Sequence, residues 1–508
     1  MNCIEGVALS GNNDRILKEL VGNSESKSDV ISDFWRFMIV CFNTPRPSTN
    51  YDGTNNEQRT EPFRRVCKRL CSNSGLCYTE DGVGNIIIRN FNDSNTQAKF
   101  CFQGHMDVVV SRNESVIHDF ETEGVDVRIT NEGTIKPIKG ITLGADNGVA
   151  IACALAVLRN NMNVPLELLI TKNEETSFDG ACGLDPTKIT APVVVNLDSE
   201  VERAICVGSA GGFEHRFTFP LTRGKNDLPT FEIRLRDLKG GHSGVDIEGE
   251  RSNAILILAR ILFSEEEKPQ VSICSLRGGT SSNAIPREAS AVIAGTVDQV
   301  EAIRGRFNDI KSELSISEPT IRLEIEETSA SNTLPATTES TRKLLALIFS
   351  LGTGVVRKLA GCVESSYNLG LVSTESDEVS LKYLIRSSSV SWMKAFSSQF
   401  SLIGRMAGAR VEDFVGFFGA WEPHYNSKIV NDLMICHPQP SCNLKTYTVH
   451  AGLECSTILE RFASIGRTNV ECASIGPQIE NAHSPDECLY IGSAEEFVQW
   501  VNNLVVRA

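Results

Sequence analysis

The sequence predicts an α/β protein with an inserted α+β domain, and three observations lead to this prediction. From residue 30 to residue 210, short runs of β-forming residues alternate with longer runs of helical periodicity, which is typical of a sheet with parallel strands. After the glycine-rich "GSAGG" at 208–212, which we interpret as a hinge, the pattern becomes strand, helix and strand until residue 420. The remaining residues return to the first pattern. We therefore expect a first domain formed by 1–211 and 421–508, with 212–420 inserted between its two parts.

The first part contains the elements that an α/β layer requires. Two stretches are predicted to be helical, "VISDFWRFMIVCFNTPRPS" at 30–48 and "PFRRVCKRLC" at 62–71, and the polar "TNYDGTNNEQRTE" between them predicts a loop. A third predicted helix, "DNGVAIACALAVLRN", carries Ala, Leu and Val at helical spacing over 146–160. Short β-rich runs predict strands at 85–90, 98–104, 165–171 and 191–197.

The inserted region combines strands and helices in another arrangement. Strands are predicted in "TFEIRLRDLKGGHSG" at 230–244 and "EASAVIAGTV" at 288–297, and "SNAILILARILFSE" between them predicts a helix. Two more helices are predicted at 301–314 and 341–352. We expect a second sheet with its helices on one face. The sequence shows no internal repeat and no low-complexity tract.

Length, charge and cysteine usage limit the classes of function. At 508 residues the chain is too long for one ordinary hydrophobic core. The formal net charge of −15 argues against a nucleic-acid or anionic-membrane partner, because both would repel an acidic surface. The N-terminus lacks the basic start of a secretory signal, and no uncharged apolar segment is long enough to span a bilayer. Because Cys101, Cys153 and Cys274 lie inside apolar runs, we expect reduced thiols and a cytoplasmic location.

A predicted strand ends at a histidine and an aspartate. The stretch "KFCFQGHMDVVV" at 99–110 is a strand that stops at Gly104 and is followed by His105 and Asp107. Residues two apart in an extended chain point to the same side, so the imidazole and the carboxylate share a face. Alone, such a pair is typical of a solvated loop, and its meaning depends on what other segments contribute.

Further acids occupy matching positions in other elements. Asp146 stands just before the apolar helix, Glu174 and Glu175 follow one predicted strand, and Asp198 follows the next. In open α/β sheets, ligand sites collect beyond the carboxyl ends of the strands, so we expect these acids to converge with the histidine and aspartate described above. Each acid alone is an ordinary turn or loop residue. Crowded carboxylates repel one another unless cations neutralise them, so the set predicts a metal cluster.

An ordered series of motifs extends over nearly the whole chain. The motifs are "GHMDVV", "TLGADNGVAIACALAVL", "NEETSFDGACGL", "NLDSE", "LKGGHSG", "GGTSSNAIPRE", "HAGLEC", "SIGP" and "HSPDE". Together they resemble the aminoacyl-histidine dipeptidases, also called cytosol non-specific dipeptidases, which belong to the two-zinc exopeptidases that include carnosinases. The resemblance implies a mixed-sheet zinc-exopeptidase catalytic domain and an inserted lid or dimerisation domain. It also implies a dipeptide substrate and a homodimer formed through the inserted domain.

The resemblance also implies a ligand set for two zinc ions per subunit. His105 and Asp198 would hold one ion, Glu175 and His483 the other, and Asp146 would bridge both. His483 takes the last position because the family's final ligand lies in the His-Ser-Pro stretch near the C-terminus. Imidazole and carboxylate ligands favour zinc, although Mn²⁺ and Co²⁺ also accept them.

Two further acids would serve the reaction itself. The carboxylate of Asp107 would orient the imidazole of His105 without binding the metal itself. Glu174, beside the ligand Glu175, would take a proton from the attacking water as general base and pass it to the departing amine. A dipeptidase of this kind cleaves short peptides, with Xaa-His dipeptides as the expected substrates.

The resemblance assigns the remaining residues to substrate binding. His242, in the glycine-rich "KGGHSG", would stabilise the oxyanion and reach its site across a dimer interface. Arg386 would grip the terminal carboxylate, a task that suits the guanidinium fork. Asn283, His450 and Glu454 match substrate-side positions of the family.

Two alternatives to an Xaa-His dipeptidase stay open at the level of sequence. A related two-zinc amidohydrolase, acting on N-acyl amino acids or Cys-Gly, would carry the same fold and the same catalytic residues. Only a panel of substrates separates it from the dipeptidase. A non-catalytic relative would keep the fold for binding or interaction, but the retention of Glu174 and of every proposed ligand argues against it.

Overall fold

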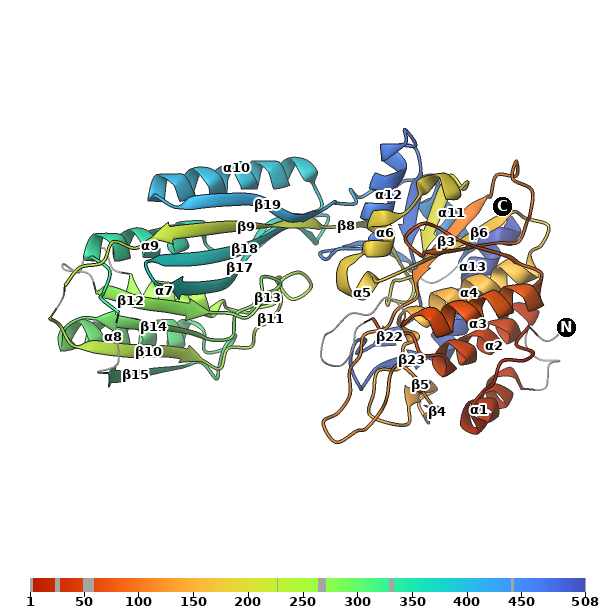
Figure 1. Ribbon diagram of the computed structural model, residues 1–508, viewed down its shortest axis with the longest axis horizontal. Helices are drawn as coiled ribbons and strands as arrows, with labels where there is room; N and C mark the ends of the chain where they lie inside the picture. Colours follow the sequence, from red (N-terminus) through yellow and green to blue (C-terminus); the bar gives the residue numbers. More distant parts are fainter. Residues whose placement is uncertain are drawn as a thin grey trace. The chain divides into compact units, whose positions relative to one another are not determined.

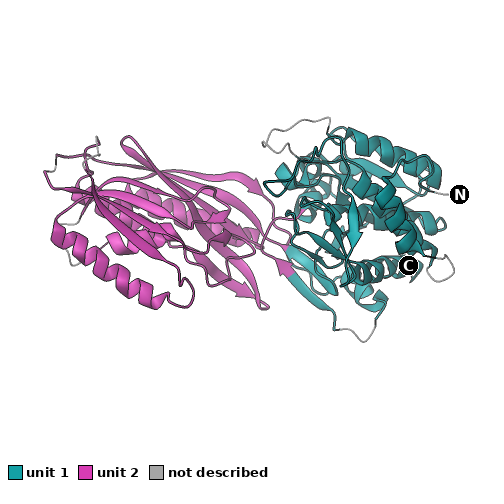
Figure 2. Ribbon diagram, turned by 90° about the horizontal axis from the view of Figure 1, so that it is seen from below, with its two compact units in different colours: residues 1–208, 423–447, 454–508 teal, residues 209–422, 448–453 magenta. Residues whose placement is uncertain are grey.

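The chain forms two compact units. The computed structural model describes residues 3–22, 28–48, 59–225, 227–263, 271–328, 333–439 and 443–507, so most of the loop predicted at 49–61 lies outside the described residues. Unit 1 comprises Met1–Gly208, Pro423–Tyr447 and Glu454–Ala508, and unit 2 comprises Ser209–Glu422 and Thr448–Leu453 (Figure 2).

Unit 1 is built on an eight-stranded mixed sheet with the order β1-β2-β6-β3-β7-β21-β8-β20 (Figure 1). Strands β6, β3, β7 and β21 run parallel at its centre, whereas β1, β2 and β8 join by antiparallel pairing. The strands are β1 (Cys77–Glu80), β2 (Ile86–Arg89), β3 (Phe100–His105), β6 (Leu166–Thr171), β7 (Val193–Asn196), β8 (Ala204–Ser209), β20 (Lys445–Val449) and β21 (Glu471–Ser474). The parallel centre aligns the carboxyl ends of four strands, where the acids and the histidine were predicted.

Helices cover both faces of this sheet. Helices α2, α4 and α13 share the main hydrophobic core with one face, and α12 covers the other, where its first residue bonds to side chains of β3 and β6. The helices are α1 (Gly11–Val21), α2 (Asp29–Asn43), α3 (Glu61–Ser74), α4 (Ala145–Asn160), α5 (Glu174–Ser177), α6 (Asp179–Gly183), α11 (Lys428–Cys436), α12 (Glu454–Ser464) and α13 (Ile491–Arg507). A 3₁₀ turn, η1, covers Pro186–Lys188. A smaller sheet, β22-β23-β5-β4, contains β4 (Val127–Ile129), β5 (Thr134–Pro137), β22 (Ile479–Glu480) and β23 (Cys488–Tyr490).

Helix α4 is buried on all sides, and its small residues bring it close to β3. Every residue from Ala145 to Leu158 is buried, which is why its alanine-rich sequence has no polar face. A Cβ at Gly104 would lie 2.7 Å from the Cβ of Ala150 and would overlap the side-chain amide of Asn147. Only glycine therefore fits before His105, and the end of β3 meets the start of α4.

Unit 2 is built on a nine-stranded antiparallel sheet with the order β15-β10-β14-β12-β17-β18-β9-β19 and with β16 paired to β17. Its helices contact one another in the sequence α8, α7, α9 and α10, so they form one layer, as predicted. The strands are β9 (Gly211–Pro220), β10 (Thr230–Arg236), β12 (Ser272–Gly278), β14 (Ala289–Ala294), β15 (Arg322–Thr328), β16 (Gly354–Leu359), β17 (Cys362–Glu375), β18 (Glu378–Ser387) and β19 (Arg410–Phe418), with the small pair β11 (Gly241–His242) and β13 (Ala284–Ile285). The helices are α7 (Ala254–Leu262), α8 (Val297–Glu313), α9 (Thr338–Leu351) and α10 (Val390–Ala407). The predicted fold class, a mixed-sheet domain with an inserted α+β domain, is confirmed.

The glycine-rich stretch predicted as a hinge consists of strand ends. Strand β8 ends at Ser209 and β9 begins at Gly211. A Cβ at Gly211 would lie 2.5 Å from the backbone nitrogen of Ala420, so close packing of backbone accounts for this glycine. The amide of Ala210 also donates to the carbonyl of Val449 at 3.0 Å, and Thr448–Leu453 accordingly groups with unit 2 rather than with the C-terminal part of unit 1.

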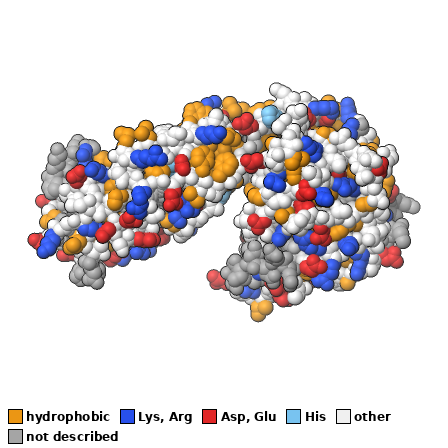
Figure 3. All heavy atoms as spheres, turned by 45° about the horizontal axis from the view of Figure 1, so that its top comes forward, with side chains coloured by type: hydrophobic (Ala, Val, Ile, Leu, Met, Phe, Trp, Pro, Cys, Tyr) orange, Lys and Arg blue, Asp and Glu red, His pale blue; other side chains and the backbone are white. Residues whose placement is uncertain are grey.

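The surface carries both signs of charge. On the face shown in Figure 3, Lys and Arg side chains are interspersed with Asp and Glu. Among the described residues, no helix has both the length and the apolar character needed to cross a membrane. Cys101 and Cys153, predicted as thiols inside apolar runs, are buried and free of disulfides.

Candidate metal centre and anion-binding group

Asp146 lies between two histidines. Its Oδ1 is 3.0 Å from Nε2 of His105, and its Oδ2 is 3.0 Å from Nε2 of His483. His105 ends β3, Asp146 stands in the first turn of α4, and His483 lies in the loop between β22 and β23. Three segments that are distant in the chain therefore meet at one carboxylate.

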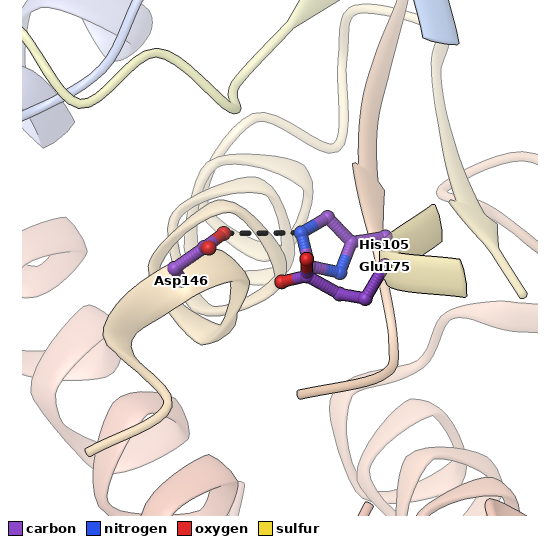
Figure 4. Close-up of side chains that lie close together, drawn as sticks. All are labelled: His105, Asp146 and Glu175. Carbon is purple, nitrogen blue, oxygen red and sulfur yellow. Dashed lines mark hydrogen bonds and ion pairs between the residues drawn. The ribbon is translucent and has the colours of Figure 1, made fainter. Parts of the chain in front are cut away.

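Each histidine also contacts a second acid. Oδ1 of Asp198 is 3.4 Å from Nε2 of His105, and Oε1 of Glu175 is 3.0 Å from Nε2 of His483. Figure 4 shows His105, Asp146 and Glu175 turned toward one another, and one ligand atom from each lies within 4.8 Å of the others. The structure thus brings together all five residues that the sequence analysis named as metal ligands, in a two-sided arrangement that shares Asp146.

The acids of this cluster are electrostatically unsatisfied. Burial, together with the charge of Asp146, raises the pKa of Glu175 to about 7 and raises the pKa of Asp198. Burial acts on Asp146 in the same direction, but the imidazoles of His105 and His483 that face it outweigh this effect and hold the pKa of Asp146 below its usual range. Oε1 of Glu175 and Oδ1 of Asp198 are buried and face the imidazole nitrogens of His483 and His105. Such oxygens require a cation.

The donor set fits divalent metal ions. Two imidazole nitrogens and three carboxylates are ligands that zinc takes in catalytic sites. The shared aspartate, with a histidine and an acid on either side, suits a pair of ions rather than one.

Asp107 supports the cluster through its backbone carbonyl and through its carboxylate. Nδ1 of His105 donates to the backbone carbonyl of Asp107 at 3.0 Å, whereas the nearer carboxylate oxygen of Asp107 is 3.7 Å from Nδ1. A carbonyl only accepts, so Nδ1 carries the proton and the lone pair of Nε2 faces the acids. The carboxylate instead accepts hydrogen bonds from the backbone amides of Glu174 and Glu175, at 3.0 and 3.3 Å. Asp107 therefore positions both the histidine and the start of α5.

Glu174 is half-buried at the first position of α5. The preceding Asn173 has a φ of 56°, a left-handed conformation that asparagine adopts more readily than most residues. The carboxylate of Glu174 has no hydrogen-bond or ion-pair partner among the residues that the structure describes. Burial raises its pKa well above the usual value, and the charges of Asp198 and Glu175 add to this.

Glu454, predicted as a substrate-side residue, lies inside a polar network of unit 1. It is fully buried, and its Oε2 accepts hydrogen bonds from Oγ1 of Thr171 at 2.6 Å and from Nε2 of Gln103 at 2.7 Å. Gln103 in turn accepts from Nδ2 of Asn196 at 2.7 Å. The network links the ends of β6, β3 and β7, so Glu454 supports the sheet beneath the acids.

Glu487, which the sequence analysis did not single out, holds the loop that carries Asp146. Its carboxylate is fully buried and accepts from the backbone amides of Leu143, Gly144 and Asp146, at 2.8, 2.9 and 3.2 Å. The buried Arg46 reaches the same loop, donating to the carbonyl of Gly144 at 2.5 Å. Glu487 ends the "HSPDE" motif, but nothing in its local sequence indicates that it holds a loop more than 300 residues away.

A second group of predicted residues lies in unit 2, around Arg386. Arg386 is only 5% exposed on β18, its Nε has no hydrogen-bond partner among the described residues, and no described carboxylate pairs with it. Burial lowers the pKa of Arg386 to about 10. Nη2 of Arg386 is 3.5 Å from Nε2 of His242. Nδ1 of His242 accepts from the amides of Gly244 and Val245, so Nε2 carries the proton, and two N–H donors face each other.

His450 and Asn283 border the same group. Nε2 of His450 is hydrogen-bonded to the hydroxyl of Ser366, which lies opposite Arg386 in the register of β17 and β18. Burial and the charge of Arg386 lower the pKa of His450 to about 3, so this imidazole is neutral. Asn283 is exposed, and its carbonyl accepts from the amide following His242 at 2.8 Å. The guanidinium of Arg386 and the Nε2–H of His242 are two donors with no acceptor between them, and together they form a site for a carboxylate or an oxyanion.

The chain is similar to proteins of known activity. It is 33% identical over 443 residues to the cytosol non-specific dipeptidase of Escherichia coli (strain K12), which covers 83% of this chain and 88% of that protein. The crystal structure of aminoacylhistidine dipeptidase from Vibrio alginolyticus matches with a TM-score of 0.80 and 28% identity, over 95% of this chain and 99% of that one.

Other matches are more general. Aminopeptidase PepT from Bacillus cereus has a TM-score of 0.52 at 15% identity, over 94% of this chain and 97% of that one, which shows the fold alone. The family model of the peptidase dimerisation domain matches residues 233–317.

Proposed function

The chain belongs to the cytosol non-specific dipeptidases of the M20 metallopeptidase family, and from this premise we propose that it hydrolyses Xaa-His dipeptides with the aid of two divalent metal ions. The observation that carries the proposal is the meeting of Asp146 with His105 on one side and His483 on the other. An acidic cluster of this composition has no structural purpose without cations, because burial and mutual repulsion would only destabilise it.

The residues of the cluster divide naturally between two ions. His105 and Asp198 would hold the first, Glu175 and His483 the second, and Asp146 would contact both. When bound, the ions polarise the scissile carbonyl and lower the pKa of water from ~15.7 toward ~7. Asp107 supports the first site, because its backbone carbonyl accepts a hydrogen bond from Nδ1 of His105 and so fixes the tautomer of that imidazole.

Glu174 is the proposed general base. It is half-buried, its carboxylate is free of partners among the described residues, and Asp107 holds its backbone amide at 3.0 Å. It would accept a proton from the water that attacks the peptide carbonyl and would deliver that proton to the departing amine. The peptide bond breaks, one water is consumed, and Glu174 returns to its starting state.

The group around Arg386 would bind the substrate. Arg386 would hold the terminal carboxylate of the dipeptide, which supplies the anion that its buried guanidinium lacks. The Nε2–H of His242 would donate to the oxyanion that forms during the reaction. Asn283 and His450, next to these two, would contribute polar contacts that orient the peptide.

A substrate panel tests the proposal. The metal-loaded enzyme is assayed with Gly-His, β-Ala-His, Cys-Gly and an N-acyl amino acid, with and without a chelator. We expect Xaa-His dipeptides to be cleaved fastest, chelation to stop the reaction, and added Zn²⁺ or Mn²⁺ to restore it. A preference for the acyl substrate or for Cys-Gly would contradict the assigned specificity, and chelator-resistant turnover would contradict the metal-dependent mechanism.

Location and assembly follow from the same premise. Its E. coli relative is named a cytosolic enzyme, so we propose a cytoplasmic location for this chain, which fractionation of tagged protein tests. The match to the peptidase dimerisation domain supports a homodimer formed through unit 2. Sedimentation velocity over a range of concentrations measures whether the dimer forms.

A further inference from the structure

We propose that Arg46 is a positioning residue of the candidate metal centre, because its guanidinium ties the segment that carries His105 to the segment that carries Asp146. The inference rests on the proposed function, since these two residues would hold the metal ions. Arg46 would touch neither metal nor substrate and would act through backbone carbonyls.

The guanidinium of Arg46 donates to two segments that are distant in the chain. Its Nη1 donates to the carbonyl of Met106 at 3.1 Å, and its Nη2 donates to the carbonyl of Gly144 at 2.5 Å. Met106 directly follows His105, and Gly144 lies two positions before Asp146. A planar guanidinium holds two acceptors in a fixed geometry. It therefore fixes the end of β3 against the start of α4, where His105 and Asp146 face each other at 3.0 Å (Figure 4).

Gly144 is held from both sides. Its carbonyl accepts from Arg46, and its amide donates to Oε2 of Glu487 at 2.9 Å. Gly144 has a φ of 75°, in the left-handed region that glycine adopts without strain. A buried cation and a buried anion thus fix the one residue at which the chain turns into α4.

The backbone at Arg46 is itself held in place. Helix α2 ends at Asn43, earlier than the predicted residue 48, so Arg46 lies in the segment after the helix. The amide and the hydroxyl of Ser48 both donate to the carbonyl of Val108, at 2.9 and 3.0 Å. The guanidinium is 5.8 Å from the ring centroid of Phe63, and Arg46 is only 4% exposed. The side chain that joins the two segments therefore starts from a fixed point.

Space for the guanidinium depends on Gly148 in α4. A Cβ at this position would lie 2.6 Å from Nη2 of Arg46, which is closer than two such atoms can approach. It would also lie 3.3 Å from the Cβ of Cys41 and 3.5 Å from Cε of Met38. The close approach of the guanidinium accounts for the glycine that follows Asp146 in "ADNG".

A positive charge is not expected beside a cation site. Like charges repel, so by charge alone Arg46 weakens the binding of a metal ion nearby. Burial lowers the pKa of Arg46, and the charges of nearby acids, Glu487 and Asp146 among them, offset this only in part. Among the described residues, no carboxylate forms an ion pair with it. The two effects give opposite results when Arg46 is removed: metal affinity rises if charge dominates and falls if positioning dominates.

Zinc titration of Arg46 variants tests the proposal. Metal-free protein competes with a chromophoric chelator for Zn²⁺, and we expect Arg46→Met to lower the affinity by about 10–100-fold. Arg46→Lys keeps the charge but not the planar fork, so its affinity should also fall, and it keeps the test open if Arg46→Met does not fold. Arg128→Met, exposed on β4, is the control and should bind as the wild type does. An unchanged or increased affinity in Arg46→Met, or wild-type affinity in Arg46→Lys, overturns the proposal.

A double-mutant cycle separates the hydrogen bonds of Arg46 from general packing. Gly148→Ala displaces Nη2 in the wild type, whereas Arg46→Met removes the atom that the new methyl group would strike. We expect Gly148→Ala to lower zinc affinity in the wild type and to have no further effect in the Arg46→Met protein. Equal losses in both backgrounds would assign the effect to packing elsewhere in α4 and overturn the proposal.

Both experiments measure metal binding rather than turnover. If the Arg46 and Gly148 variants lose affinity as expected, but the wild type cleaves no dipeptide, the proposed function is refuted and this inference stands. If the wild type cleaves dipeptides and Arg46→Met binds zinc as the wild type does, the proposed function stands and this inference is refuted.

Discussion

The candidate metal centre in unit 1 and the Arg386 group in unit 2 are electrostatic opposites. In the first, carboxylates gather, and burial raises the pKa values of Glu174, Glu175 and Asp198. In the second, a buried guanidinium lies beside two imidazoles, and burial lowers the pKa values of Arg386 and His450. Among the described residues, only two imidazoles face the acids of the first group, and no carboxylate pairs with the guanidinium of the second. The sign of the missing charge indicates the ligand, a divalent cation for the first and a carboxylate or oxyanion for the second.

The largest effect is expected at Glu174. The Glu174→Gln substitution removes the proposed base but none of the five proposed ligands, so kcat should fall by about 10²–10⁴-fold while the metal content stays unchanged. Steady-state kinetics and elemental analysis measure the two quantities. Glu132→Gln, on an exposed loop of unit 1, is the matched control and should behave as the wild type. Loss of metal from the Glu174 variant would show that this residue belongs to the cation site.

Arg386→Met tests the Arg386 group of unit 2. A buried cation without a partner is costly to desolvate, so its removal should leave the free energy of unfolding unchanged or increase it. The same change should raise KM on the order of 100-fold, because the substrate carboxylate loses its partner. Arg410→Met, which breaks an exposed ion pair with Glu378, is the control. A large loss of stability with an unchanged KM would make Arg386 a structural residue.

A smaller effect is expected at Glu487, which touches the metal centre only through the backbone. In Glu487→Gln, one oxygen that accepts from the amides of Leu143, Gly144 or Asp146 becomes a donor and repels them. The loop that carries Asp146 should loosen, and metal affinity should fall by about 10–100-fold. Competition with a chromophoric chelator measures this affinity. Glu480→Gln, an exposed neighbour on β22, should leave it unaltered; equal affinities in all three proteins would refute the positioning role.

The smallest effect concerns His215, a buried histidine of unit 2 outside both groups. Both of its ring nitrogens lack partners among the described residues, and burial lowers its pKa from 6.5 to about 4. Between these two values the unfolded chain binds a proton that the folded chain does not, so the free energy of unfolding decreases as the pH falls. The loss is at most roughly 3 kcal/mol.

Denaturant unfolding at pH 7 and pH 5 measures this difference. His215→Phe, which keeps an aromatic ring beside Phe213, Phe217 and Phe400, should reduce the pH dependence. The exposed His424→Phe should retain the wild-type pH dependence. If His215→Phe changed turnover instead, His215 would have a role in the reaction although it lies outside both groups. The contrast between the two groups would then not identify all functional residues.

The sequence was most informative where function lies at the end of a regular element. His105 follows a run of β-forming residues, and Asp146 precedes a helix of small apolar residues, so periodicity placed both at the same edge of a sheet. The choice of His483 as the last ligand came from resemblance rather than from periodicity. Glu487 and Arg46 were not predicted, because their roles depend on backbone groups of one distant loop. The burial of Glu454 was likewise invisible in its local pattern.

By itself, the sequence determined the elements, their order and the residue types at the ends of strands, because periodicity and backbone preferences act over a few residues. Only the tertiary structure decided which charges face one another. Asp146 and His483 are 337 positions apart, and His242 and Arg386 are 144 apart, so no local pattern encodes either contact. Electrostatic interactions depend on distance in space and on burial, and both arise only when the chain has folded.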